Sequence, residues 1–103
     1  MSLTELNIAA INALCEKNRV EALYLFGSIV TDKFNNESDI DFLIQFGEIP
    51  IEEYFDNYLD FKEEMEKLLG RPVDIVENQA IRNPIFRKVV DRNKMLIYER
   101  KSA

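Results

Sequence analysis

The stretch that decides the fold is Glu21-Ala-Leu-Tyr-Leu-Phe-Gly-Ser-Ile-Val-Thr-Asp-Lys-Phe-Asn-Asn-Glu-Ser-Asp-Ile-Asp-Phe-Leu-Ile-Gln-Phe46. It begins with an uninterrupted apolar run, residues 22–26, which is too short for a helix and is typical of a strand covered on both faces. We predict this strand from about Val20 to Phe26. A polar segment separates this run from a second predicted strand, Ile40 to Phe46. We expect the two strands to pair antiparallel, so that the end of the first lies beside the start of the second.

Two aspartates stand at the start of the second predicted strand. Because side chains alternate along a strand, Asp39 and Asp41 lie on one face and Ile40 lies on the other. Adjacent carboxylates repel each other, and a hard cation such as Mg²⁺ would remove that repulsion. At the end of the first strand, Gly27 and Ser28 allow backbone N–H groups and a hydroxyl to face a phosphate. The antiparallel pairing would bring the two halves of this site together.

A long amphipathic helix is predicted for residues 51–69, where apolar side chains recur at helical spacing. Gly70 is a typical residue just past a helix C-terminus, and Pro72 stops the helix. The apolar arc covers nearly half of the helix circumference, which is more than one sheet contact requires. We therefore expect this helix to pack against the sheet and a neighbouring helix, with a partner subunit as the alternative.

A third aspartate follows this helix, in a short predicted strand over residues 73–76. A strand–helix–strand connection of this length makes the strands at 40–46 and 73–76 parallel through a right-handed crossover. The starts of the two strands are then adjacent, which places Asp74 beside Asp41.

The remaining segments predict two shorter helices and an edge strand. Residues 2–5 resemble a capping box ahead of a helix that ends near Asn18, and Asn83-Pro84 starts another helix. Residues 95–98 form a last strand, and we expect the polar tail, residues 99–103, to be frayed. The fold class is α+β: a mixed sheet of three to four strands with helices mainly on one face.

Composition narrows the class of protein. A chain of 103 residues is one domain, residues 1–103, in which we base nothing on residues 1–3. The net charge of −6 argues against a general nucleic-acid binder. The single cysteine, Cys15, belongs to an apolar helix face and is interpreted as a buried hydrophobic residue. Because one cysteine cannot form a disulfide within the chain, its presence is typical of a reducing compartment, and we expect a cytoplasmic protein. We identify no signal peptide or membrane-spanning run. The absence of histidine leaves carboxylates, hydroxyls, amines or metal for any chemistry.

Three motifs together point to a known family. The segments Phe26-Gly-Ser28, Asp39-Ile-Asp41 and Gly70-Arg-Pro-Val-Asp74 resemble those of the minimal nucleotidyltransferases of the DNA polymerase β superfamily, over about residues 6–98. The resemblance implies a polymerase β-like fold and transfer of a nucleoside monophosphate from ATP, or another nucleoside triphosphate, to a hydroxyl. It also implies the roles of five residues: Asp39 and Asp41 would hold two Mg²⁺ ions, Asp74 would complete the site, and Gly27 and Ser28 would bind the triphosphate.

The resemblance also implies a protein partner. Small members of this family are commonly antitoxins that are encoded beside a helical toxin of the HEPN class, and some adenylylate a tyrosine on that toxin. We therefore expect a HEPN-type partner here.

One departure from the family pattern leaves alternatives open. Many relatives follow Gly-Ser with arginine, in the pattern Gly-Ser-x-Ala-Arg-Gly, whereas this chain has Ile29-Val-Thr-Asp32. A cation that would hold the triphosphate is missing there. The candidates to replace it are Lys33, Arg71, Arg82, Arg87 and Lys88. Three functions thus remain: a transferase, a module of the same fold that neutralises a partner by contact, and a regulatory domain that binds nucleotide without transfer.

Overall fold

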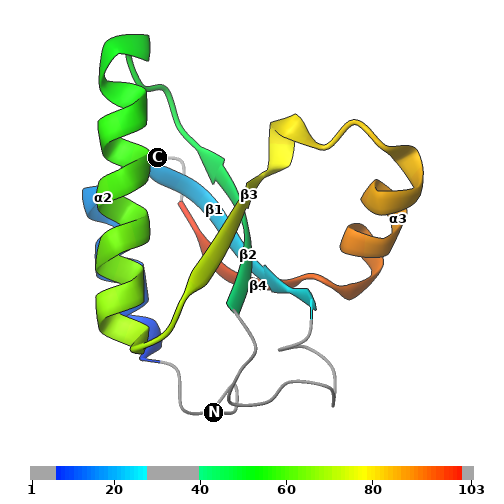
Figure 1. The fold of residues 1–103 in the computed structure, drawn as a ribbon, viewed down its shortest axis with the longest axis horizontal. Coiled ribbons are helices and arrows are strands. Elements are labelled where there is room, and N and C mark those ends of the chain that lie inside the picture. The colour runs from blue at the N-terminus through cyan, green and yellow to red at the C-terminus, as the bar shows by residue number, and fades with distance from the viewer. Residues whose placement is uncertain (1–6, 28–39, 101–103) are drawn as a thin grey trace.

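The computed structural model describes residues 7–27 and 40–100. In chain order, its elements are α1 (Ile8–Lys17), β1 (Val20–Phe26), β2 (Ile40–Phe46), α2 (Ile51–Leu69), β3 (Val73–Glu77), the short 3₁₀ helix η3 (Asn78–Ala80), α3 (Pro84–Asn93) and β4 (Met95–Glu99) (Figure 1). The predicted site residues Ser28 and Asp39 lie outside the described residues, as does the whole segment between them. The strands and the long helix have the bounds that the sequence predicts, to within one residue at each end.

The four strands form one mixed sheet in the order β3-β2-β1-β4. β1 pairs antiparallel with both β2 and β4, whereas β2 and β3 are parallel and are joined by α2. The predicted antiparallel pair and the predicted parallel crossover are both confirmed. The chain therefore has the expected α+β fold.

One face of the sheet packs against α1 and α2 and forms the main hydrophobic core. Leu23 pairs with Ile44 and Leu25 pairs with Phe42, and all four side chains are fully buried. The two helices contribute Ile11, Cys15, Phe61, Met65 and Leu69 to the same cluster. Alternation along the strands then directs the intervening side chains to the opposite face.

Only part of the wide apolar arc of α2 faces the core. The helix packs on the sheet and on α1, as predicted, and it ends at Gly70, which has a left-handed conformation with φ of 70°. However, Ile51, Phe55 and Leu59 remain exposed, with Ile51 85% and Phe55 68% accessible. The partner subunit predicted as the alternative is compatible with these residues. Within the two described ranges, none of the helices is long and apolar enough to span a membrane.

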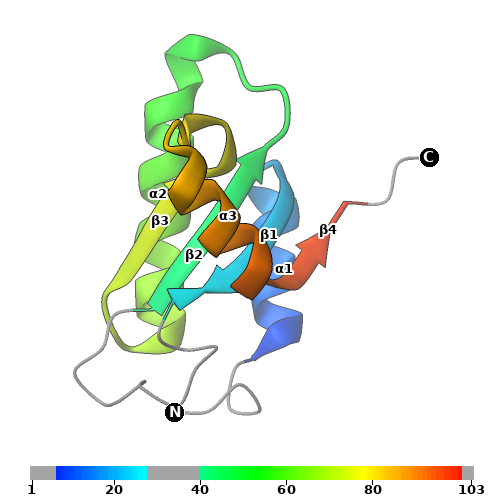
Figure 2. The same cartoon turned by 90° about the vertical axis from the view of Figure 1, so that its right-hand side faces the viewer.

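The helix α3 lies across the sheet face that α1 and α2 leave open (Figure 2). Helices are thus mainly, but not only, on one face. Ring contacts join this segment to β1: Phe86 of α3 packs edge-on against Phe26 with ring centroids 6.3 Å apart, and the ammonium of Lys94, just after α3, lies 4.6 Å from the centre of the Tyr24 ring. Leu43 and Val90 are fully buried but do not belong to the main core. The second face is therefore only partly covered.

The two chain ends differ in how far the structure tests the predictions. The cap of α1 is Asn7, whose side chain accepts a hydrogen bond from the backbone of Ala10, whereas the box predicted at residues 2–5 lies outside the described residues. The prediction for the tail needs correction. The tail is not frayed at its start, because Glu99 belongs to β4 and the Arg100 amide donates to the Glu21 carbonyl at 2.8 Å. Polar side chains at an edge strand resemble those of a loose tail, although the backbone is paired.

We predict that Phe61→Ala lowers the free energy of unfolding by about 3–5 kcal/mol, because it leaves a cavity in the core. Phe61 has no exposed surface and its ring centroid lies 6.3 Å from that of Phe46. The matched control is Phe55→Ala on the same helix, which should change stability by no more than about 0.5 kcal/mol. Urea denaturation followed by circular dichroism measures both values. Equal losses in the two variants would contradict the assigned faces of α2.

We also predict that Cys15 resists thiol reagents in the folded protein. Its side chain is completely buried, and burial, with a smaller contribution from Glu16, raises the pKa of the thiol to about 12. At pH 8 the reactive thiolate is therefore scarce as well as inaccessible. Ellman's reagent should react quickly in guanidinium chloride and slowly, at the rate of unfolding, without it. A fast reaction in native buffer would contradict the burial of α1 against the sheet.

Candidate active site

Three strand positions form one row across the sheet at the start of β2. Phe26, the last residue of β1, pairs with Asp41, and Asp41 pairs with Asp74 of β3. The alternation of buried core residues places Asp41 and Asp74 on the face away from α1 and α2. Asp41 is half-buried and Asp74 is exposed. Two carboxylates from different segments of the chain thus occupy neighbouring positions on the partly covered face.

Gly27 directly follows β1, and its backbone lies against the Asp41 side chain of this row. Its φ of +77° lies in the left-handed region, and a Cβ built on it would collide with Oδ2 of Asp41 and would lie 3.1 Å from Cγ of the same carboxylate. Only glycine lets the backbone approach the aspartate this closely. The convergence of the glycine turn with the aspartate strand, which the sequence predicts, is therefore present at Gly27.

Of the five predicted site residues, the structure brings Gly27, Asp41 and Asp74 together. Ser28 and Asp39 lie outside the described residues, so their placement and roles stay predictions. No group of three or more carboxylate, thiol or imidazole side chains suited to a metal occurs within residues 7–27 and 40–100. The described part of the site therefore supplies two carboxylates.

The two carboxylates have the chemistry that a magnesium ion requires. Directly paired residues on neighbouring strands have backbones about 4.8 Å apart, so side chains on the same face can reach a common ion. Mg²⁺ takes oxygen ligands and is usually held by one or two carboxylates, with substrate phosphates and water completing its octahedron. Asp41 and Asp74 fit this donor set, and the backbone of Gly27 lies against the Asp41 carboxylate.

A polar network that no local sequence pattern predicts holds α3 on the same face of the sheet as this row. Arg87 donates to the backbone carbonyl of Asn78 at 2.6 Å and to its side chain at 2.8 Å, and the Asn78 amide donates to Gln45 of β2 at 3.4 Å. Asp91 accepts hydrogen bonds from Arg87 and Lys94, and these cations lower the pKa of its carboxyl. No local pattern marks these residues, because Gln45 and Asn78 are 33 positions apart in the chain.

This network includes Arg87, one of the side chains that the sequence offers as a cation for the triphosphate. Arg87 donates hydrogen bonds to Asn78 and Asp91, so its guanidinium supports α3. Arg82 and Lys88 are exposed, and Arg71 is half-buried two residues before β3. Lys33 lies outside the described residues.

Comparison with known proteins now identifies the family. The sequence model of the family described as "Polymerase beta, Nucleotidyltransferase" matches residues 9–103. The chain belongs to this family. It is 36% identical over 85 residues to a protein of Methanocaldococcus jannaschii that is provisionally named a protein adenylyltransferase, with 82% of each chain covered. It is 32% identical over 77 residues to the protein adenylyltransferase MntA of Thermococcus cleftensis, with 75% of each covered.

Solved structures agree with the fold. A protein provisionally described as a minimal nucleotidyltransferase superimposes with a TM-score of 0.76 at 29% identity, covering 92% of this chain and 95% of the other. A toxin–antitoxin structure with AMP-PNP gives a TM-score of 0.71 at 19% identity, covering 93% and 76%. A complex of a tri-AMPylated HEPN toxin of Shewanella oneidensis with an MNT antitoxin gives 0.62 at 18%, covering 91% and 71%. This nucleotidyltransferase chain therefore has the fold of its family.

We predict that alanine is tolerated differently at the two left-handed glycines. Gly70→Ala should cost about 1 kcal/mol, because it adds backbone strain in open space. Gly27→Ala adds the same strain and forces the Asp41 side chain to move, which should raise the loss to about 2–4 kcal/mol. Urea denaturation of both variants provides the comparison. Equal losses would contradict the close approach of Gly27 to Asp41.

Proposed function

We propose that this chain is a Mg²⁺-dependent nucleotidyltransferase that transfers a nucleoside monophosphate from ATP, or another nucleoside triphosphate, to a hydroxyl on a partner protein. The partner would be a HEPN-type toxin, and the transfer would make this chain an antitoxin in the cytoplasm. The observation that carries the proposal is the row at the start of β2, where Gly27 lies against Asp41 and Asp41 pairs with Asp74.

Sequence relatives and structural neighbours support different parts of this proposal. Two of the sequence relatives, 36% and 32% identical to this chain, bear the name of protein adenylyltransferases. The structural neighbours include a toxin–antitoxin pair with an ATP analogue and a HEPN toxin that carries AMP groups in complex with an MNT antitoxin. These neighbours are below 20% identical, so they support the fold directly and the substrate and partner by analogy.

Each of the five predicted site residues would have a separate role. Asp41, with Asp39, would hold two Mg²⁺ ions, which when bound stabilise charge on the attacking and leaving oxygens. Asp74 would complete the site nearest the acceptor hydroxyl. Gly27 and Ser28 would bind the triphosphate through backbone N–H groups and the hydroxyl. Because phosphoryl transfer depends mainly on positioning and charge neutralisation, few other groups are required.

The reaction itself is a substitution at phosphorus. The acceptor oxygen forms a bond to the α-phosphorus, the bond between that phosphorus and the bridging oxygen breaks, and pyrophosphate leaves. The hydroxyl proton passes to Asp74 or to water. Asp74 is exposed at the edge of the site, which allows a side chain of another protein to reach it.

A second candidate function is neutralisation of the partner by contact, with a vestigial metal site. Two observations favour it: the family arginine is replaced within residues 29–32, and Arg87 is held by Asn78 and Asp91. In that case Asp41→Asn would leave neutralisation intact, whereas Phe55→Ser would abolish it. Phe55 is the informative position because it is exposed, whereas Tyr54 packs its ring 5.6 Å from that of Phe46 and supports the fold.

We predict that Asp41→Asn and Asp74→Asn each reduce transfer of label from α-³²P-ATP by at least about a hundredfold, because even partners of metal ligands are worth about 10–100-fold. The acceptor is the co-purified product of the neighbouring reading frame. The matched control is Asp56→Asn on the exposed surface of α2, which should keep full transfer. Removal of Mg²⁺ by EDTA should abolish transfer in the parent protein.

Other outcomes would select between the functions. Full transfer in both site variants would reject the assignment of the aspartates. Saturable binding of Mg²⁺-ATP in calorimetry without transfer to any acceptor would favour the regulatory, nucleotide-binding function. Neutralisation of the partner that survives Asp41→Asn but not Phe55→Ser would favour the contact mechanism.

A further inference from the structure

The two edges of the sheet differ in how their backbone is covered. At the β3 edge, the side chains of α2 reach over the strand: Tyr58 donates a hydrogen bond to the Ile75 carbonyl at 3.4 Å, and Glu66 accepts one from the Val73 amide at 3.0 Å. These bonds satisfy outward-facing backbone groups that would otherwise accept another strand. The β3 edge is therefore covered by α2 side chains at Val73 and Ile75.

The β4 edge has no such cover within the described residues. The Arg100 amide donates to the Glu21 carbonyl, so this residue faces β1, and by alternation the amide and carbonyl of Glu99 point away from β1. No strand within residues 7–27 and 40–100 pairs with this outer side. Met95 and Leu96 are about half exposed, and proline is absent from the strand. Such an edge is a template for a further strand.

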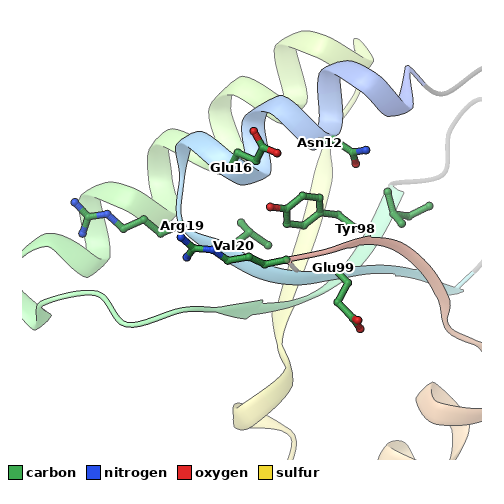
Figure 3. Close-up of a pocket in the computed structure, with 8 residues that line it drawn as sticks. Asn12, Glu16, Arg19, Val20, Tyr98 and Glu99 are labelled. Carbon is green, nitrogen blue, oxygen red and sulfur yellow. The ribbon is translucent and has the colours of Figure 1, made fainter. Parts of the chain in front are cut away.

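A groove runs beside this open edge, between β4 and α1 (Figure 3). Its volume is about 680 Å³. A register shift between Leu23 and Tyr24 turns both Ile97 and Tyr98 toward the core, and these two residues form the floor. Asn12 and Glu16 stand above Tyr98 on α1, one turn apart, whereas Glu99 points to the other face of the strand (Figure 3).

The polar groups of the groove favour a ligand whose side chain donates hydrogen bonds. Oδ1 of Asn12 is buried and has no hydrogen-bond partner among the described residues. A buried carbonyl without a donor costs about 1–3 kcal/mol, which a ligand could recover. Glu16 adds a carboxylate four residues away. Two arginines, Arg19 and Arg100, also line the groove. Arg19 is directed to Glu53 at 3.2 Å, and Nη1 of Arg100 would lie 3.9 Å from a Cβ built on Gly47.

We propose that the β4 edge and the groove under α1 bind an extended segment of another protein, which adds a fifth strand to the sheet and places a lysine or arginine between Asn12 and Glu16. This is strand addition, in which backbone hydrogen bonds provide affinity and alternate side chains provide specificity. The groove starts at Val20, roughly 20 Å along β1 from Gly27. The inference therefore does not depend on nucleotidyl transfer.

A second copy of this chain fits the edge less well. Two β4 strands related by a twofold axis at Ile97 would place Lys94 of each copy opposite Arg100 of the other. Each copy also carries a net charge of −6, which opposes close approach. The charges favour a basic segment of a different protein.

The test uses the full chain labelled with ¹⁵N and the peptide acetyl-Thr-Val-Thr-Lys-Thr-Val-Thr-amide as the probe. We expect saturable shifts of the backbone amides of residues 97–100 and of the Asn12 side-chain amide. Replacing the lysine of the peptide by glutamate should weaken binding at least tenfold, which corresponds to about 1.4 kcal/mol. Methylating alternate amide nitrogens of the peptide should abolish binding, because the ladder cannot form.

Two protein variants complete the test. Asn12→Leu should weaken binding of the lysine-containing peptide about tenfold. Gln79→Leu, which replaces an exposed amide side chain far from the groove, should leave the affinity unchanged. The proposal is overturned if the peptide causes no saturable shift, if the shifts lie outside α1 and β4, or if the methylated peptide binds equally well. It is also overturned if sedimentation reveals a dimer of the chain that protects the β4 amides from exchange, since a second copy would then be the occupant.

Discussion

The site depends on one close approach, that of the Gly27 backbone to the carboxylate of Asp41. The antiparallel pairing of β1 with β2 places the end of one strand against the start of the other, and the parallel pairing of β2 with β3 adds Asp74 to the same row. Backbone hydrogen bonds define both alignments. The geometry of the three positions is therefore a property of the sheet, and side-chain packing has only to preserve it.

The two faces of this sheet are built from different interactions. The face under α1 and α2 is a continuous apolar core, in which Phe46 alone contacts three aromatic rings. The other face holds α3 mainly through Arg87, Asn78 and the edge-on pair of Phe26 and Phe86. Polar attachment leaves the surface around Asp41 and Asp74 partly uncovered. A closed face that provides stability thus supports a partly uncovered face that carries Asp41 and Asp74.

Much of this arrangement can be predicted from the sequence, because hydrophobic period and connection length determine it. The apolar run at 22–26, the helical spacing over 51–69 and the crossover to Asp74 need only local patterns and handedness rules. The position of α3 could not be predicted, since the same apolar pattern would suit either face of the sheet. The bond between Gln45 and Asn78 links distant segments, and the paired backbone of Arg100 leaves no trace in side-chain composition.

The cover that α2 provides at the β3 edge has a consequence for chemistry on the opposite side of the sheet. Side chains alternate along a strand, so a slip of one residue would turn Asp74 into the core and bring an apolar neighbour to the surface. The hydrogen bonds that Tyr58 donates to β3 and Glu66 accepts from it are made only when β3 sits in one alignment. The long helix, whose core-facing side chains lie on the other face of the sheet from Asp41, thereby helps determine the direction in which Asp74 points.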